Sequence, residues 1–98
     1  MADTPGYMSP EVLLGGEADH RSDIFALGIV FYEMLIGRHP FGAEHRTAAA
    51  LQVTPISVGK LAPSIAVGLD RIIAKMLAKS PDERYATAAD LLVDLKNL

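Results

Sequence analysis

The sequence predicts an all-α protein of about five helices packed around one hydrophobic helix. Residues 24–36 (IFALGIVFYEMLI) contain a single charged side chain and have no polar face at either helical or strand periodicity. Ser22 and Asp23 are capping residue types at the start of this stretch, and Gly37 followed by Pro40 ends it. A helix that is apolar on all sides must be buried, so we expect it at the centre with the other segments covering it.

Length and composition limit the classes of protein. The chain has 98 residues, half of them hydrophobic, which fits one small domain. Its net charge of -3 comes from scattered charges of both signs, without the clustered Lys and Arg that nucleic-acid phosphates require. We therefore expect no nucleic-acid partner. The lack of cysteine excludes disulfides and thiolate metal sites and fits the cytoplasmic location that we expect.

No signal peptide, lipidation signal or transmembrane run is recognisable in the sequence. The apolar stretch would form a helix of roughly 20 Å, well short of the ~30 Å hydrocarbon core of a bilayer. We expect no membrane contact from this chain.

The region before the central helix predicts an ordered loop and a short helix. Residues 1–11 contain two prolines and a glycine. Ser9, Pro10 and Glu11 fit the cap, the first-position proline and the first-turn acid of a helix that continues to about Leu14. A Gly-Gly pair ends this helix, and residues 17–21 form a polar connection.

Three segments follow the central helix before the next strong helical pattern. Residues 38–42 (RHPFG) predict a turn. Residues 44–53 have high helix propensity but few large apolar side chains, so we expect a weakly packed helix there. Residues 54–64 contain Pro55, Gly59 and Pro63 and predict a loop.

The C-terminal third predicts two amphipathic helices separated by a single turn. Apolar residues at 65, 69, 72, 73, 76 and 77 have helical spacing. Residues 80–83 (SPDE) repeat the cap, proline and acid pattern of a helical turn. Thr87 and Asp90 resemble a capping box, and four leucines follow on one face: Leu91, Leu92, Leu95 and Leu98. No segment convincingly predicts a strand.

Residue types alone predict no catalytic constellation. His20, His39 and His45 lack the spacing and the acidic neighbours of a zinc site, and we interpret them as solvated or capping histidines. A Gly-rich phosphate loop is absent, and no serine or threonine has a histidine and an acid at recognisable spacing. These patterns indicate only a small helical domain with excess apolar surface.

The order of four sequence motifs indicates the protein family more specifically than residue types do. They are residues 4–11 (TPGYMSPE), 22–28 (SDIFALG), 32–41 (YEMLIGRHPF) and 79–85 (KSPDERY). In this order and spacing they resemble the C-terminal lobe of the eukaryotic-like Ser/Thr protein kinase domain, with a flavour similar to its bacterial branch. The resemblance extends from about Thr4 to Leu98, and it implies that residues 1–98 are a partial kinase domain.

The resemblance implies that four residues of this lobe lie on the side that binds the protein substrate. Thr4 matches the threonine that contacts the catalytic aspartate and lysine beside the incoming hydroxyl. Tyr7 and Met8 match the loop that forms the pocket for the substrate residue after the phosphoacceptor. Glu33 matches an acid that can line a pocket for basic substrate residues, although many kinases keep it without that preference.

It also implies three structural residues. Glu11 matches the acid of the Ala-Pro-Glu motif, with Ser9 where alanine is commonest, and Arg84 matches its buried arginine partner. Asp23 matches the aspartate that accepts hydrogen bonds from the backbone of the catalytic loop. Without the resemblance, Glu11 would be a first-turn acid, Arg84 a solvated side chain and Asp23 an ordinary N-cap.

This sequence departs from the family pattern mainly in the motifs that perform catalysis. The Gly-rich loop, the strand lysine, the His-Arg-Asp loop with its asparagine and the Asp-Phe-Gly aspartate are all missing, and the family places them upstream of Thr4. Asp3 replaces a usual glycine, and Met1 and Ala2 resemble a start plus filler. The resemblance thus implies a parent that uses ATP and magnesium, and a fragment that holds neither.

Three hypotheses of function follow. The first is a substrate-side kinase fragment without phosphotransfer activity in isolation, whose partners are a protein substrate or the missing kinase segments. The second is a stand-alone helical interaction module, and the third is a regulatory piece that binds an intact kinase. We also expect a homodimer or higher oligomer through the central helix, because part of the face formed by Ile24, Leu27, Phe31, Met34 and Leu35 should lack an intramolecular partner.

Overall fold

The computed structural model describes residues 7–42 and 53–98. These residues form five α-helices and one 3-10 turn, and no strand occurs in the two ranges. The elements are α1 (Pro10–Leu13), α2 (His20–Ile36), α3 (Val58–Leu61), α4 (Val67–Met76), η4 (Pro81–Glu83) and α5 (Ala88–Lys96). The predicted fold class, all-α with about five helices around a hydrophobic one, is confirmed.

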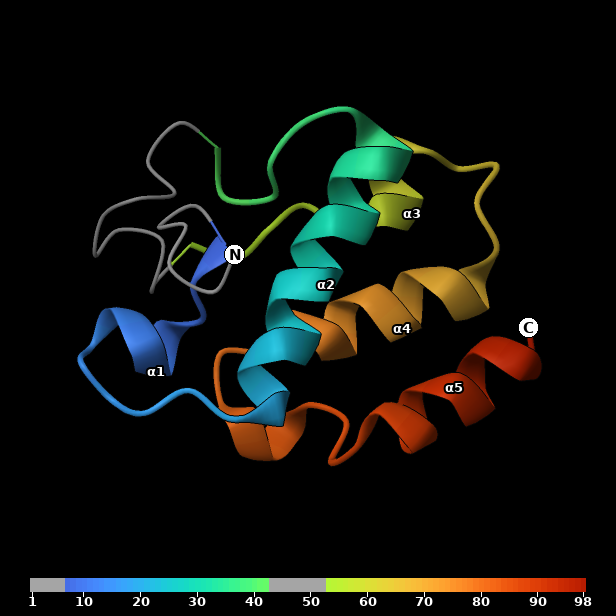
Figure 1. The fold of residues 1–98 in the computed structure, drawn as a ribbon. Coiled ribbons are helices and arrows are strands. Elements are labelled where there is room, and N and C mark those ends of the chain that lie inside the picture. The colour runs from blue at the N-terminus through green and yellow to red at the C-terminus, as the bar shows by residue number, and fades with distance from the viewer. Residues whose placement is uncertain (1–6, 43–52) are drawn as a thin grey trace.

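Helix α2 is the centre of the arrangement (Figure 1). Helix α4 crosses it, α3 lies near its C-terminal end, and α5 lies beside α4. Two groups of buried side chains form the core, and α2 and α4 contribute to both. The first group comprises Phe25, Ile29, Tyr32, Phe41, Val58, Ile73 and Leu77. The second comprises Ile24, Ile72, Met76, Tyr85 and Leu91.

The crossing of α2 and α4 depends on Gly28. A Cβ atom at this position would lie 2.9 Å from Met76 Cβ and 3.1 Å from Leu77 Cδ2. Only a residue without a side chain therefore lets the two helices approach this closely. The missing side chain at one position of α2 thus fixes how α4 packs on it.

The start of α2 differs from the prediction. The N-cap is Asp19 instead of Ser22 or Asp23: the Arg21 backbone N–H donates to Asp19 Oδ1 at 2.7 Å, and the Asp19 N–H donates to Ser22 Oγ at 3.3 Å. This reciprocal capping box adds a turn that the predicted polar connection included. The predicted end is confirmed, because Gly37 adopts the left-handed conformation with φ 87°.

The predicted loop over residues 54–64 is wrong in its middle. Ser57 accepts a hydrogen bond from the Lys60 backbone N–H and caps α3, a single turn that the nearby Pro and Gly residues concealed. Val58 is 1% exposed and packs in the core, so tertiary burial stabilises a turn that local propensity does not favour. The helix predicted over 44–53 lies outside the described residues except for Val53, which is not helical.

The other elements agree with their predictions within a few residues. Ser9 and Pro10 begin α1, residues 38–42 form a turn, and η4 is the single turn predicted at 80–83. Helix α4 begins at Val67 instead of Ile65. The Thr87 hydroxyl accepts a hydrogen bond from the Asp90 N–H and caps α5.

The expectation that α2 is buried on every side is wrong. Met34 is 76% exposed, and Leu27, Val30 and Leu35 are also exposed. The prediction that part of the face around Met34 lacks an intramolecular partner is confirmed for Leu27, Met34 and Leu35. Ile24 of that face is buried, because it packs in the second core group with Tyr85 and Leu91 of the C-terminal segment.

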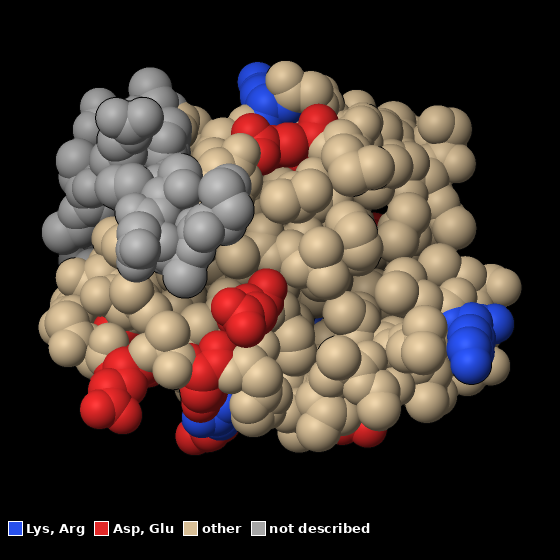
Figure 2. Space-filling view, viewed as in Figure 1, with Lys and Arg blue, Asp and Glu red and all other residues tan. Residues whose placement is uncertain are grey.

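The leucine face predicted for α5 is only partly buried. Leu91 packs in the core and Leu95 against it, whereas Leu92 and Leu98 are exposed. A space-filling view shows that much of the visible surface around α2, α4 and α5 is uncharged (Figure 2).

Candidate functional site

Glu11 and Arg84, which lie on α1 and directly after η4, form a bidentate ion pair. Arg84 Nη1 donates to Glu11 Oε2 at 2.7 Å, and Nη2 donates to Oε1 at 2.8 Å. The Arg84 side chain is fully buried, and that of Glu11 is 20% exposed. The pair that the family resemblance implies is therefore present, and it joins the two ends of the described chain.

Arg84 uses all of its hydrogen-bonding capacity. A guanidinium has five N–H donors. Besides the two bonds to the carboxylate, Nε donates to the Ala78 carbonyl at 2.8 Å, Nη1 to the Arg21 carbonyl at 3.1 Å and Nη2 to the Lys79 carbonyl at 3.2 Å. The guanidinium carbon also lies 4.8 Å from the centre of the Phe25 ring. One side chain thus ties together α1, the start of α2 and the segment after α4.

The environment of Glu11 keeps its carboxylate ionised. Burial acts to raise its pKa, but hydrogen bonds from Arg84, from its own backbone N–H and from Ser22 at 2.8 Å outweigh burial and lower the pKa to about 2. The nearby Ser9 hydroxyl also acts to lower this pKa, although Ser9 Oγ is buried and makes no hydrogen bond of good geometry within the described residues.

Sequence reasoning missed two contributors to this cluster. Ser22 was predicted as an N-cap, but its hydroxyl donates to Glu11 while its oxygen accepts from the Asp19 N–H. Arg21 was assigned to a polar connection, but it forms exposed ion pairs with Asp19 at 3.0 Å and Asp82 at 2.8 Å. The sequence carries no signal for the pair with Asp82, the acid directly after the Ser-Pro of η4, because Arg21 lies on a distant segment.

Lys79 lies next to the same cluster. Its ammonium is 4.0 Å from the centre of the Phe41 ring. Burial, together with the charge of Arg84, lowers the pKa of Lys79 to about 8.

The second group of predicted site residues meets between the N-terminal segment and α2. The Tyr7 hydroxyl donates to Glu33 Oε1 at 2.7 Å, and the His39 ring packs edge-on against the Tyr7 ring at a centroid distance of 5.9 Å. The hydrogen bond to Glu33, partial burial and the charge of Glu33 all raise the pKa of Tyr7. Met8, beside Tyr7, is half-buried. Thr4 lies outside the described residues.

Asp23 is arranged differently from the other predicted structural residues. It is exposed in the first turn of α2, and its carboxylate makes no hydrogen bond or ion pair within residues 7–42 and 53–98. An exposed acceptor at this position is free to bind a further donor.

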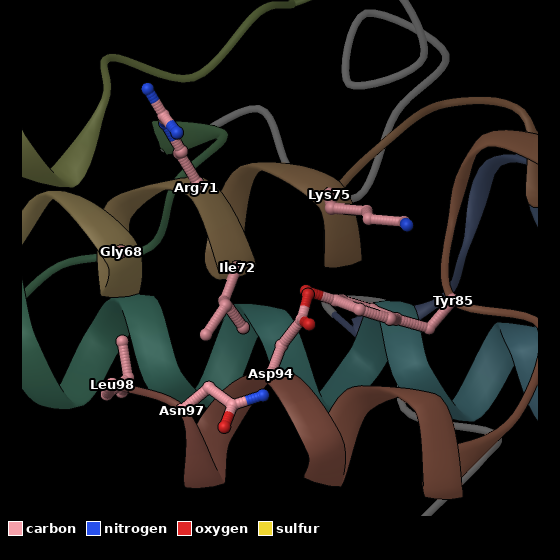
Figure 3. Close-up of a pocket in the computed structure, with 8 residues that line it drawn as sticks. All are labelled: Gly68, Arg71, Ile72, Lys75, Tyr85, Asp94, Asn97 and Leu98. Atoms are coloured by element: carbon pink, nitrogen blue, oxygen red, sulfur yellow. The ribbon is translucent and has the colours of Figure 1, made fainter.

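A cavity of about 250 Å3 lies between α4 and α5 (Figure 3). Its polar side chains pair with one another: the Tyr85 hydroxyl donates to Asp94 at 2.8 Å, and the Lys75 ammonium lies 4.5 Å from the centre of the Tyr85 ring. In Figure 3, Tyr85 and Asp94 meet between the two helices, whereas Arg71 points away from them. These contacts hold α5 against α4.

Metal-binding clusters and membrane-spanning helices do not occur in the described part of the chain. No group of three His, Asp or Glu residues there is arranged to hold a metal ion. None of its helices has the length and hydropathy needed to cross a bilayer.

Comparisons with known proteins identify the family. Residues 1–94 match the protein kinase domain. The serine/threonine-protein kinase PrkC of Bacillus subtilis is 44% identical over 93 residues, which cover 92% of this chain and 14% of PrkC. The serine/threonine-protein kinase PknB of Mycobacterium leprae is 41% identical over 95 residues, covering 94% of this chain and 15% of PknB. The chain thus spans about a seventh of the length of these relatives.

Solved structures show the same fold. A crystal structure of the Mycobacterium tuberculosis PknI kinase domain has a TM-score of 0.76 at 24% identity, and the match covers 98% of this chain and 35% of that one. The twitchin kinase region of C. elegans has a TM-score of 0.80 at 22% identity, with 96% and 17% covered. The helices described above make up part of the C-terminal lobe in such a fold, and this chain belongs to the protein kinase domain family.

Proposed function

We propose that this chain forms the structural and substrate-side part of a Ser/Thr protein kinase domain and does not transfer phosphate by itself. The observation that carries the proposal is the hydrogen bond between Tyr7 and Glu33. It joins two segments that the family resemblance assigns to the substrate side, and it fixes the position of the Glu33 carboxylate. By the same resemblance, Thr4 matches the threonine beside the incoming hydroxyl, and Tyr7 and Met8 match the loop that forms the pocket for the next substrate residue.

The Glu11–Arg84 cluster supports this role by holding α1 in place. Helix α1 follows the Tyr7–Met8 segment directly, so any movement of α1 would displace the proposed substrate pocket. Asp23 is exposed and has no side-chain partner in the described ranges, which supports its proposed role as an acceptor of hydrogen bonds from the backbone of a catalytic loop in the whole kinase.

We propose that ATP and magnesium are cofactors of the whole kinase and are held outside this chain. The proposal rests on the sequence, which has none of the motifs with which the family holds nucleotide and magnesium. The proposed partners are a protein substrate and the remaining kinase segments, in the cytoplasm and without nucleic acid or membrane contact from this chain.

A graft into PrkC tests the structural and substrate-side role. In the PrkC kinase domain, the matching segment would be replaced by this chain, and peptide phosphorylation would be measured. We expect an active chimera, since the two segments are 44% identical. Glu33→Gln should reduce the preference for substrates with basic residues, and the matched control Glu17→Gln, an exposed acid outside both clusters, should not. A folded chimera without activity would contradict the proposal.

Calorimetry tests the second half of the proposal. The purified chain, titrated with ATP and magnesium, should give no saturable heat, because the family's nucleotide-binding motifs are absent from its sequence. Saturable binding at micromolar ATP would show that the nucleotide site is not wholly outside this chain.

The exposed apolar face of α2 favours a second candidate function, an interaction or regulatory module that docks on an intact kinase. The two candidate functions differ in whether the chain acts as a separate molecule or as a segment of the kinase chain. A module should change the activity of intact PrkC when it is added as a separate chain, whereas a kinase segment should act only when it replaces its counterpart.

A further inference from the structure

His39 lies between the proposed substrate side and the hydrophobic core. Its ring packs edge-on against the Tyr7 ring, with centroids 5.9 Å apart and an interplanar angle of 61°. The same ring is tilted against the Phe41 ring at a centroid distance of 5.8 Å. Tyr7 in turn donates its hydroxyl hydrogen to Glu33. The orientation of the His39 ring therefore bears on the position of the Glu33 carboxylate.

The turn that contains His39 fixes the orientation of its ring. The Phe41 backbone N–H donates to His39 Nδ1 at 3.1 Å, and the Gly42 N–H donates to the His39 carbonyl at 3.1 Å. Because Nδ1 accepts a hydrogen bond, the imidazole is neutral and carries its proton on Nε2. These local bonds select one ring orientation, and in that orientation the ring contacts Tyr7.

Phe41 anchors this turn in the core. Its side chain is 5% exposed and stacks on Phe25 with an interplanar angle of 3° and a centroid distance of 5.8 Å. The Lys79 ammonium lies 4.0 Å from the centre of the Phe41 ring. Stacked rings and a cation over a ring both add to the stabilisation that burial provides. His39 therefore contacts Tyr7 from a base that belongs to the first core group.

Tyr7 needs such support because its own side chain is only partly buried. It packs against the first core group from the segment that precedes α1. Its hydroxyl is bound to Glu33, which fixes the tip of the side chain alone. A hydrogen bond weakens steeply when its geometry is disturbed, so movement of the ring would open this bond. A neighbour packed against the flank of the ring keeps it closed.

We propose that His39 is a positioning residue of the substrate side: its ring holds Tyr7 where the Tyr7 hydroxyl fixes the Glu33 carboxylate. The consequence for substrate rests on the proposed function. Without the ring, fewer molecules have Glu33 in place, and the apparent affinity for substrate falls by that fraction. An edge-on aromatic contact is worth about twofold to tenfold in such an equilibrium.

Titration of Tyr7 in the 98-residue chain tests the contact without substrate. The NMR resonance of the Tyr7 Cζ carbon, identified by its absence in Tyr7→Phe, reports ionisation of the hydroxyl. The hydrogen bond to Glu33 is the main cause that raises the pKa of Tyr7, so His39→Ala should lower that pKa towards 10.0. The combination of His39→Ala with Glu33→Gln should lower it by clearly less than the sum of the single effects, because His39 acts through this bond.

Two further substitutions of His39 separate the ring from its nitrogen. Phenylalanine keeps a ring but cannot accept from the Phe41 N–H, whereas asparagine offers an acceptor without a ring. His39→Phe should therefore leave the pKa of Tyr7 closer to the wild-type value than His39→Asn does. His20→Ala is the matched control, because the His20 ring contacts the Ala86 carbonyl at the opposite end of α2 and should not affect Tyr7.

The same variants in the PrkC chimera test the consequence for substrate. At about pH 8, where an ordinary imidazole is neutral, His39→Ala should raise KM for a basic peptide about twofold to tenfold and leave kcat unchanged. His20→Ala should change neither constant. Circular dichroism melting of every variant checks that it folds.

Three results would overturn the proposal: an unchanged pKa of Tyr7 in His39→Ala, a reversed order of His39→Phe and His39→Asn, or a shifted pKa with an unchanged KM. An inactive parent chimera would contradict the proposed function alone, because the titration of Tyr7 decides on the His39 contact without substrate.

Discussion

Replacing Arg84 by alanine should remove much of the stability of this protein. The substitution leaves the Glu11 carboxylate with only Ser22 as a side-chain donor, and it leaves the carbonyls of Ala78, Lys79 and Arg21 without the bonds that the guanidinium provides. Breaking a buried ion pair by removing one partner costs about 3–5 kcal/mol. Because Glu11 is partly exposed, we expect about 3 kcal/mol, against a total of about 5–15 kcal/mol for an average domain.

Thermal unfolding followed by circular dichroism measures this effect. A loss of about 3 kcal/mol corresponds to a decrease in Tm of roughly 12–24 °C in a domain of this size. Arg71→Ala is the control, because Arg71 is exposed on α4 and makes no ion pair in the described ranges. If both substitutions lowered Tm equally, the reasoning about the buried pair would be refuted.

The same ion pair predicts a dependence on pH. The pKa of Glu11 is lowered from 4.5 to about 2 in the folded state, so folding is stabilised above pH 4.5 and loses this contribution as the pH falls towards 2. If Glu11 were fully shielded from solvent, this pKa shift would contribute about 3 kcal/mol to the free energy of unfolding. Because Glu11 is partly exposed, we expect a contribution of about 2 kcal/mol. Urea unfolding of the wild type and of Glu11→Gln between these pH values should show a steeper loss for the wild type. Parallel curves would contradict the assignment.

Three further predictions concern single positions. Gly28→Ala should destabilise the fold by about 1–2 kcal/mol in urea unfolding, because its Cβ would meet Met76, whereas Gly68→Ala should be tolerated because it meets only the movable end of Leu98. Ser9→Ala should be neutral or stabilising by up to about 1 kcal/mol in the same assay, since the buried hydroxyl makes no hydrogen bond of good geometry to any described residue, and a marked loss would reveal a partner. In alkaline spectrophotometric titration, Tyr7 should ionise above its ordinary pKa of 10.0, and Glu33→Gln should lower that pKa; an unchanged curve would exclude the Tyr7–Glu33 bond in solution.

The end of α2, the cap of α5 and the presence of a central hydrophobic helix could be predicted from the sequence because they depend on neighbouring residues. Gly37 ends α2 by adopting a conformation that other residues avoid, and Thr87 caps α5 through its own side chain. The order of the four motifs was also sufficient to identify the family. In these cases the physical cause lies within a few residues of the chain or in its linear order.

The tertiary structure decided what depends on segments distant in sequence. The single turn α3 exists because Val58 is buried in the core, and Ile24 is covered because the C-terminal segment reaches it. Ser22, predicted as a cap, became a donor to Glu11 only when α1 was placed beside α2. Burial free energy and hydrogen-bond geometry depend on the neighbours that folding brings together, and periodicity along the chain does not contain that information.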